Sequence, residues 1–455
     1  MVQKLYDNSP IWLQNIMVAL AGYKKNRGRY GKEYYRYRDF LGEFDSWPLK
    51  KKLEYQFDEL KKLLAHAKAN SPFYAGLYKD IDLSSINTID DLRSLPIVTK
   101  EMLRQNIFDV DTTQRKGLQG HTGGTTGKSL TVYYTKKNAM QRMALLDHFK
   151  ARTGFMHLKM RRASFNGKHI VPPGQKSKIF WRYNPACKQM IFSSFHITEE
   201  NCRFYVEALN RFKPMAIDGF FMSIYDIANY IERHSVKLDF QLLAVFPTSE
   251  TLTAPGRELI ERVFNCKVYD QYASSEGAPF ITECPKQTAH VEMASGIFEH
   301  ESEMNDEVLV TSFSTYGTPL IRYQIGDKVM FKNEVLSCDC NLQSIEVAEI
   351  QGRKMDFLYS SDGSKINSVN IANMFKNLPN VVIKAQLVQD SLLDIRMNLV
   401  VDKEIFTENH RRILLEEFTH KFGRDSVLTI EIVDDIARES SGKFKFVVNN
   451  VSIPT

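Results

Sequence analysis

Cysteine is scarce in this sequence, which holds only six in 455 residues. So few thiols in so long a chain argue against a disulfide-stabilised scaffold and favour core thiols or metal ligands in a reducing compartment. Long hydrophobic runs are also missing: no stretch of about 18 apolar residues occurs, which argues against a membrane-spanning helix. The N-terminus lacks the basic, apolar and cleavage regions of a signal peptide. We therefore expect a cytoplasmic protein.

A strong charge imbalance is absent too. Sixty lysines and arginines against 54 aspartates and glutamates leave a net charge of +6, without long basic blocks. Nucleic acid is therefore not an expected partner, and a small anionic substrate fits better. The composition, 43% apolar and 25% charged, is that of a globular protein, and the length requires two or three domains.

The order of apolar patterns indicates the fold. Between residues 160 and 270, short apolar runs alternate with helical ones, which predicts a largely parallel sheet with helices on its faces. Ligands of such sheets bind beyond the carboxyl ends of strands. Residues 307–336 read as antiparallel strands. The predicted fold class is α/β, with a large N-terminal domain of mixed sheets flanked by helices over residues 1–353 and a small α+β domain over residues 354–455.

Several single elements can be predicted. Apolar residues at helical spacing predict a helix from Leu53 to Ala69, which the Ser71-Pro72 pair ends. A second helix is expected over Ser368–Asn377. The β-rich segments Lys267–Asp270 and Leu320–Tyr323 are each expected to be strands.

Residues 9–22 predict a short amphipathic helix, and a basic tract follows it up to Lys32. One interpretation is docking to an anionic membrane surface. The other is a helix packed on the domain beside a solvated loop. Because so short a stretch buries little apolar area in a bilayer, we favour the second, and membrane contact is expected to be absent or peripheral.

The stretch from His121 to Ser129 concentrates three glycines, three threonines and one lysine. Free backbone N–H groups, hydroxyls and a cation are what a polyphosphate requires. The strict P-loop pattern fails, because Thr122 stands where that motif has its first glycine. The stretch is thus either a different phosphate loop or a hairpin turn. The β-rich segment Thr131–Thr135 predicts a strand-loop-strand setting.

Five motifs in one order resemble those of acyl-adenylate-forming enzymes, the superfamily of acyl-CoA synthetases and luciferases. The resemblance is closer to the phenylacetate-CoA ligase branch and its CapK-type and coenzyme F390 synthetase-like members, the CapK-type proteins being those of surface-polysaccharide gene clusters. The motifs are the Gly/Thr loop Thr122–Lys128, Tyr272-Ala273-Ser274-Ser275-Glu276, Tyr323–Asp327, the hinge Gly352-Arg353, and Ser441-Gly442-Lys443.

This resemblance implies ATP, Mg²⁺ and a set of site residues. The implied nucleotide-binding residues are Thr122, Gly123, Gly124, Thr125, Thr126, Gly127, Lys128, Ser249, Glu250, Tyr272, Ala273, Ser274, Ser275, Glu276, Asp327 and Arg353. Tyr272 offers a ring for adenine, Glu276 an oxygen for Mg²⁺, and Asp327 an acceptor for ribose hydroxyls. Lys443, Glu276 and Arg353 are the implied catalytic residues, and Lys443 would arrive on a mobile terminal domain to neutralise charge on the α-phosphate.

Two positions depart from the family pattern. Gln324 replaces the usual arginine of the ribose motif, which weakens a nucleotide contact. Met355 stands where the hinge often has aspartate or lysine, which puts in doubt the full domain rotation that CoA synthetases make.

A second constellation consists of Cys284, His290, Cys338 and Cys340. Three thiolates and an imidazole suit tetrahedral Zn²⁺, and close pairs joined by a long connection are how structural sites are assembled. Related phenylacetate-CoA-ligase-like proteins carry similar cysteines. The alternative is unrelated core thiols and a surface histidine. We favour a structural zinc site.

The resemblance implies ATP-dependent adenylation of a small-molecule carboxylic acid and transfer of the acyl group to a thiol such as CoA or to an amine. An amide ligase acting on a sugar precursor, an adenylyl transferase and a non-catalytic scaffold are the alternatives. The sequence does not identify the acid, the acceptor or the oligomeric state. Ser164–Gly167 and Phe220-Phe221 are candidate walls of the acyl pocket.

Overall fold

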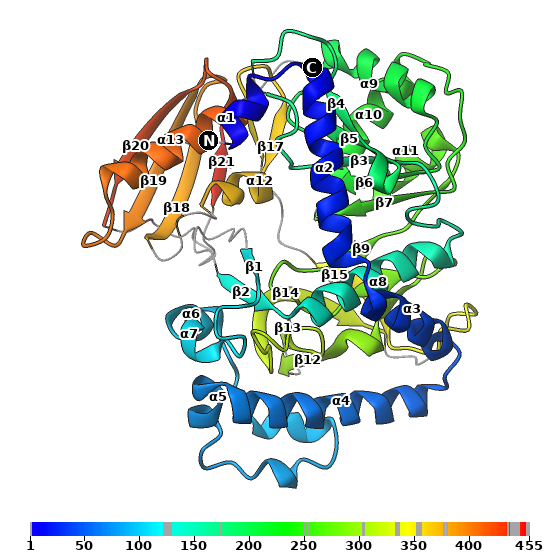
Figure 1. Cartoon of the computed structure of the whole chain (residues 1–455), viewed down its shortest axis with the longest axis vertical. Helices are drawn as coiled ribbons and strands as arrows, with labels where there is room; N and C mark the ends of the chain where they lie inside the picture. The colour runs from blue at the N-terminus through cyan, green and yellow to red at the C-terminus, as the bar shows by residue number, and fades with distance from the viewer. Residues whose placement is uncertain are drawn as a thin grey trace.

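The computed structural model describes residues 2–121, 130–172, 174–249, 252, 254–302, 305–332, 337–351, 357–375, 378, 381–434, 436 and 446–451. Within these ranges the strands form five sheets, which confirms the predicted α/β class. Figure 1 shows the antiparallel sheet in the lower half, the mostly parallel sheet at the upper right and the C-terminal unit at the upper left. None of the described helices is long and apolar enough to cross a membrane.

The first 110 residues are helical. The helices are α1 (Val2–Asp7), α2 (Ile11–Arg29), α3 (Lys32–Asp45), α4 (Leu49–Asn70), α5 (Pro72–Leu77), α6 (Lys100–Gln105) and α7 (Ile107–Val110). Helix α4 buries Leu60, Leu63, Leu64 and Ala67 at the spacing that the sequence predicts. It ends one residue before Ser71, whose hydroxyl accepts a hydrogen bond from the backbone N–H of Tyr74 and so caps α5.

The six-stranded sheet has the order β4-β5-β3-β6-β7-β8, and all neighbours except β4 and β5 run parallel. The strands are β3 (Arg162–Asn166), β4 (Trp181–Asn184), β5 (Gln189–Ser193), β6 (Ala216–Phe220), β7 (Ala244–Thr248) and β8 (Lys267–Val268). The helices that alternate with them or precede them are α8 (Lys136–Arg152), α9 (Glu199–Phe212), α10 (Phe221–Arg233) and α11 (Ala254–Phe264). The largely parallel sheet predicted for this region is confirmed.

A second sheet of seven antiparallel strands has the order β12-β13-β14-β15-β11-β10-β9. The strands are β9 (Gln271–Tyr272), β10 (Ile281–Glu283), β11 (Ala289–Val291), β12 (Gly296–Ser302), β13 (Asn305–Ser312), β14 (Tyr323–Phe331) and β15 (Glu346–Gln351). The Tyr272 ring of the last strand lies 6.2 Å from the Phe298 ring of β12, at the opposite end of that order. The sheet therefore curls until its two edges approach each other.

The hairpin of β1 (Leu118–His121) and β2 (Thr131–Tyr134) forms a two-stranded sheet of its own, and its residues Val132 and Tyr133 pack into the core beneath the seven-stranded sheet. Its last pair is His121 opposite Thr131, so the glycine-rich stretch between them joins two paired strands. The predicted strand-loop-strand setting is confirmed. Residues 122–129 themselves lie outside the described residues.

The C-terminal unit has its own sheets and hydrophobic core. Its elements are β16 (Phe357–Tyr359), β17 (Lys365–Asn367), α12 (Ser368–Ala372), β18 (Val382–Gln389), β19 (Asp394–Val401), α13 (Glu408–Phe422), β20 (Val427–Ile432) and β21 (Val447–Asn449). Four of these strands pair in the order β20-β19-β18-β21. Phe195, from the loop after β5, belongs to the same core, so the unit is packed against the large sheet region.

Four expectations need correction. Lys267–Asp270 is not one strand, because β8 ends at Val268 and the next strand, β9, belongs to the other sheet. Leu320–Arg322 precede β14 as irregular backbone, with Arg322 at a φ of +46°. The segment from Ser368 is α-helical only to Ala372 and continues as a 3₁₀ turn over Asn373–Phe375, while residues 376–377 lie outside the described residues. The basic tract after residue 22 is not a loop, since α2 continues to Arg29.

Candidate active site and metal centre

The glycine-rich hairpin and the Tyr272–Glu276 motif are neighbours. Tyr134, the last residue of β2, donates a hydrogen bond of 2.8 Å from its hydroxyl to the carbonyl oxygen of Ser275. This contact fixes the base of the hairpin against the loop that follows β9. The structure thus brings together two nucleotide motifs that lie about 140 residues apart in the sequence.

Arg142 of α8 also holds the loop that follows β9. Its guanidinium donates to the carbonyl oxygens of Gly277 and Ala278, each at 2.9 Å, and to that of Ser274 at 3.3 Å. It also lies 4.3 Å from the centre of the Phe280 ring. A planar donor with several N–H groups can satisfy consecutive carbonyls that a turn leaves unpaired. The sequence gave no sign of this role, because an arginine on a helix is usually exposed.

Tyr272 and Asp327 meet across the curled sheet. The Tyr272 hydroxyl donates to Asp327 Oδ2 at 2.8 Å. Asp327 lies in a bulge of β14: Glu307 pairs with Lys328 and Leu309 with Gln324, so β14 carries extra residues between these pairs. Gly326 within the bulge has a φ of +78°, a conformation that favours glycine. The bulge turns the Asp327 carboxylate toward Tyr272.

Glu276 lies next to a cation that the sequence did not single out. Lys100 Nζ is 3.7 Å from Glu276 Oε1, and both side chains are largely buried. Lys100 begins α6, and the segment before it is tied to the ribose motif because Val98 N–H donates to Arg322 O and Gln324 N–H donates to Val98 O. A carboxylate and an ammonium group therefore stand together beside the hairpin and β14.

The end of β7 adjoins the same region. The Gln271 side chain donates to the Pro247 carbonyl at 3.3 Å, which joins β9 to β7. Ser249, two residues beyond Pro247, is exposed and has a φ of +66°. Ser249, Tyr272–Glu276 and Asp327 are the predicted nucleotide-binding residues that the structure describes. The other predicted nucleotide-binding residues, Thr122–Lys128, Glu250 and Arg353, lie outside the described residues. The same holds for the rest of the hinge, Gly352 and Met355, and for the motif Ser441–Lys443.

Asp270, between β8 and β9, is a carboxylate whose charged form the fold disfavours. Burial and the charge of Glu283 raise its pKa from 3.8 to about 6. Its Oδ1 atom accepts a hydrogen bond of 2.8 Å from the backbone N–H of Gln271. Because its folded pKa is raised, Asp270 favours folding below pH 4, and that contribution is lost as the pH rises to about 6.

We therefore expect Asp270→Asn to stabilise the protein above pH 6, by at most about 3 kcal/mol for a pKa difference of about two units. Asparagine keeps the acceptor for Gln271 and removes the charge. Thermal unfolding of both proteins from pH 4 to 8 is the measurement. The difference in Tm should be near zero at pH 4 and positive at pH 8; equal Tm values at pH 8 would refute the assignment.

The four predicted zinc ligands lie in one cluster. Their ligand atoms are all within 4.8 Å of one another. Cys284 follows β10, His290 is on β11, and Cys338 and Cys340 lie before β15. The Sγ atoms of Cys284 and Cys338 are 3.7 Å apart, and Cys340 Sγ is 3.4 Å from His290 Nε2.

These distances fit a tetrahedral zinc ion better than a disulfide. Zn–S bonds of about 2.3 Å at tetrahedral angles place two sulfur atoms about 3.8 Å apart, whereas a disulfide needs about 2.05 Å. Hydrogen bonds hold the residues around the cluster in place. Glu346 accepts one from the Cys338 backbone N–H at 2.7 Å and one from Lys332 Nζ at 2.9 Å. The Lys286 backbone N–H points at Cys284 Sγ, 3.3 Å away, which stabilises a thiolate.

The C-terminal unit contacts the carboxyl ends of β3 and β5. Lys421 of α13 is buried and lies 3.1 Å from His169 Nε2, while His169 stacks on Phe195 at 4.6 Å. Burial and the charge of Lys421 lower the pKa of His169 to about 3, so its neutral imidazole accepts from Lys421. At Gly167 a Cβ would lie 2.1 Å from Asn370 Oδ1, so glycine permits this close approach.

Only part of the expected acyl-pocket wall lies near the contact between Gly167 and the C-terminal unit. Phe165 is buried and stacks on Phe192 at 4.9 Å, and Ser164 donates a hydrogen bond to Asp218. These two side chains belong to the core of the six-stranded sheet. The Phe220 ring lies next to Gly167, since a Cβ added there would be 3.2 Å from Phe220 Cε2. Phe220 therefore remains a candidate wall of the acyl pocket.

Comparison with known proteins gives sequence relatives that span the chain. Protein CapK of Staphylococcus aureus is 36% identical over 455 residues, 99% of this chain and 100% of its own length. A phenylacetate-coenzyme A ligase of Thermus thermophilus is 22% identical over 407 residues, covering 82% of this chain and 87% of its own. The CapK C-terminal domain family matches residues 358–450.

Solved structures show the same fold. A 2-hydroxyisobutyryl-CoA ligase, crystallised in an open conformation with 2-HIB-AMP and CoA, superposes with a TM-score of 0.54. The superposition covers 89% of this chain and 93% of the ligase, at 14% sequence identity. At this identity the likeness concerns the fold alone.

Proposed function

Because the chain belongs to the CapK-type branch of the adenylate-forming enzymes, we propose that it is an AMP-forming acid ligase that activates a carboxylic acid with ATP. The product of the first step is an acyl-AMP mixed anhydride, and the second step transfers the acyl group to CoA or to an amine. The name of the Thermus thermophilus relative supports CoA as acceptor.

The observation that carries this proposal is the meeting of distant motifs at one place. Tyr272 donates to Asp327, the neighbouring Ser275 accepts from Tyr134 of the hairpin, and Glu276 lies beside Lys100. Carboxylate, aromatic and cationic groups around a glycine-rich hairpin form a site of the kind that a nucleoside triphosphate requires.

The chemistry follows from these groups. A carboxylate oxygen of the acid attacks the α-phosphorus of ATP, the bond to the bridging oxygen breaks, and pyrophosphate leaves with its electron pair. A thiol or amine then attacks the acyl carbon, loses its proton and displaces AMP. Asp327 would hold the ribose hydroxyls, and Lys100 would place a positive charge near the phosphates.

Mg²⁺, when bound, would neutralise charge on the phosphates, and Glu276 would be its protein ligand. The residue fits this role, because its side chain is 16% exposed, follows directly on Ser275, which contacts the hairpin, and offers the carboxylate oxygens that Mg²⁺ prefers. We further propose Arg353 as a phosphate or ribose contact at the hinge. Lys443 would stabilise the charge that develops as the acid attacks.

We propose a domain boundary at residue 353, with residues 354–455 as a lid. The separate core of the C-terminal unit and its contact with His169 support a unit that closes over the carboxyl ends of the strands. We also propose a structural zinc ion at Cys284, His290, Cys338 and Cys340. The distances among these ligand atoms support it.

The CapK resemblance supports a role in surface-polysaccharide biosynthesis or modification, with a sugar precursor as acid or amine. Pyrophosphate release from ATP tests the activity across aryl, fatty, amino and uronic acids, with and without CoA and amines. Release that depends on an acid, followed by a thioester or amide product, is the expected result. Absence of release with every acid would favour a non-catalytic scaffold.

Asp327→Ala is expected to raise the KM for ATP by about ten- to a hundredfold, because two ribose hydroxyls would lose a charged acceptor. Tyr272→Phe should raise it only a few-fold, since the hydroxyl acts through Asp327 while the ring remains. Steady-state pyrophosphate release at varied ATP is the measurement. Tyr269→Phe, three residues earlier and buried, is the matched control and should leave KM unchanged. An unaltered KM in Asp327→Ala would remove the ribose role.

A further inference from the structure

The two buried residues of helix α2 are the polar Gln14 and the small Gly22, whereas its largest apolar side chains are exposed. Gln14 lies against the protein, where its side chain donates to the Tyr6 carbonyl and accepts from the buried Arg182. A Cβ at Gly22 would lie 2.1 Å from Asn184 Oδ1, so this face of the helix is in close contact. The most deeply buried positions of the helix are therefore not its large apolar residues, in contrast to the usual amphipathic orientation.

On the opposite face, four large apolar side chains form one stripe, with exposed fractions of 65% for Trp12, 46% for Ile16, 65% for Leu20 and 56% for Tyr23. Their spacing of four, four and three residues places them above one another along the helix. Single exposed apolar residues are ordinary, but a contiguous stripe of aromatic and aliphatic side chains marks an interaction surface. The helix is packed on the domain as expected, but this apolar stripe faces away from it.

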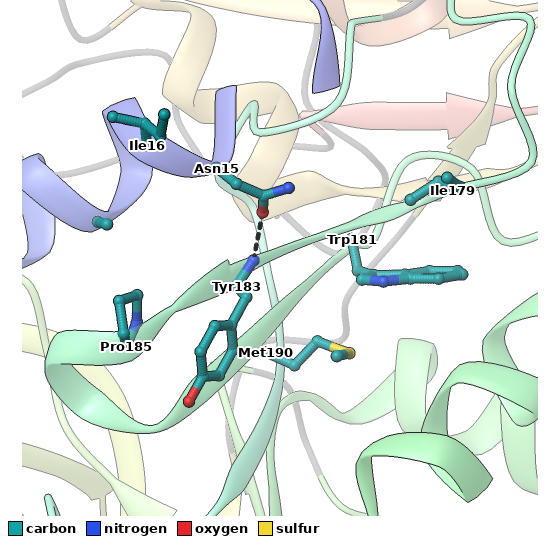
Figure 2. A pocket seen from close by; sticks show the side chains of 8 residues that line it. Asn15, Ile16, Ile179, Trp181, Tyr183, Pro185 and Met190 are labelled. Carbon is teal, nitrogen blue, oxygen red and sulfur yellow. Dashed lines mark hydrogen bonds between the residues drawn. The ribbon is translucent and has the colours of Figure 1, made fainter. Parts of the chain in front are cut away.

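An open apolar cavity of about 420 Å³ lies beside this stripe. Figure 2 shows Ile16 and Asn15 of α2 on one side, with Trp181 and Tyr183 of the edge strand β4 on the other. Asn15 Oδ1 accepts a hydrogen bond of 2.8 Å from the Tyr183 backbone N–H, so a helix side chain satisfies the sheet edge. Because Ile16 belongs to both features, the apolar surface continues from the helix to β4.

The charge around the stripe has one sign. No acidic residue occurs between Ser9 and Lys32, although Asp7 and Glu33 flank the segment. Lys24 and Arg27 are exposed on the second half of α2, and Arg27 follows Tyr23 by four residues on the same face. The surface thus combines apolar anchors with cations.

We propose that this face of α2 docks the protein peripherally on an anionic phospholipid surface. Trp12, Ile16, Leu20 and Tyr23 enter the interfacial layer, and the basic side chains contact the headgroups. A symmetric contact between two copies would bring two segments of net positive charge together, whereas an anionic lipid surface complements that charge, which favours the lipid surface over a second copy. One helix of this size gives reversible binding that weakens with salt.

Cosedimentation of the full-length protein with vesicles tests the proposal, using phosphatidylcholine alone or mixed with phosphatidylglycerol. We expect binding to the mixed vesicles, little binding to phosphatidylcholine, and a blue shift of tryptophan emission. Trp12→Ser with Leu20→Ser should lower the affinity at least about tenfold. Lys24→Glu with Arg27→Glu should abolish the preference for the anionic lipid.

Phe108→Ser is the matched control, since Phe108 is 60% exposed on α7 and should not affect binding. Unchanged Tm and pyrophosphate release in every variant show that the fold is intact. Absence of binding to both vesicles, or equal loss in the control, would overturn the proposal. A dimer that dissociates on Trp12→Ser would also overturn it, because a second copy would then cover this face.

Discussion

Lys443→Ala is expected to lower acid-dependent pyrophosphate release by about 10²–10³-fold while ATP binding stays nearly unchanged. The reason is electrostatic: the proposed role of this ammonium group is to stabilise charge that develops only as the acid attacks the α-phosphate. The nucleotide contacts of the hairpin, Tyr272 and Asp327 are independent of it. Pyrophosphate release at saturating ATP and acid, with ATP affinity by equilibrium binding, is the measurement.

The control for this experiment is Lys445→Ala, which removes the same charge two residues further along the chain. It should retain most of the activity. If both variants lose activity equally, or if Lys443→Ala turns over like the wild type, the role assigned to Lys443 is wrong. A loss that appears in the KM for ATP instead of the turnover number would make Lys443 a binding residue.

Loss of the metal cluster should have the second large effect, on stability. We expect about one zinc ion per chain in protein purified without added metal, and none in Cys284→Ser. In the proposed site, one ion would join four ligands and so link β10 and β11 to the segment before β15. Such a site contributes ~10 kcal/mol in small domains and less where a large core exists, so the Tm should fall by several degrees or more.

Cys266→Ser is the matched control for Cys284→Ser. Cys266 is a partly buried free thiol that is not among the four residues of the cluster. Its replacement should leave both the zinc content and the Tm nearly unchanged. If the purified wild-type protein contains no zinc and its Tm equals that of Cys284→Ser, the four side chains are ordinary thiols and an imidazole.

Local pattern predicted the elements of the fold well. The spacing of Leu60, Leu63, Leu64 and Ala67 defines the buried face of α4, because a helix repeats every 3.6 residues. The alternation of strands and helices likewise predicted the parallel sheet. The prediction of a single strand over Lys267–Asp270 failed, since no local signal tells which of two sheets a short strand joins.

Motif order predicted a set of site residues, and the structure brings Tyr272, Glu276 and Asp327 near the hairpin, but the sequence did not show how they meet. The contact of Tyr272 with Asp327 depends on the curl of a seven-stranded sheet and on a bulge in β14, and neither has a clear signature in a single sequence. Arg142 and Lys100 were missed because an isolated basic residue on a helix has no pattern. The exposed stripe of α2 could not be predicted, because helical periodicity shows that one face is apolar, not which face meets the protein.

A crystal structure with Mg²⁺ and a non-hydrolysable ATP analogue tests the central claim most directly. The account predicts one nucleotide with its phosphates at Gly124 and Lys128, its metal at Glu276 and its ribose hydroxyls at Asp327. A nucleotide bound elsewhere, with Gly124, Glu276 and Asp327 all free of contact, would contradict it.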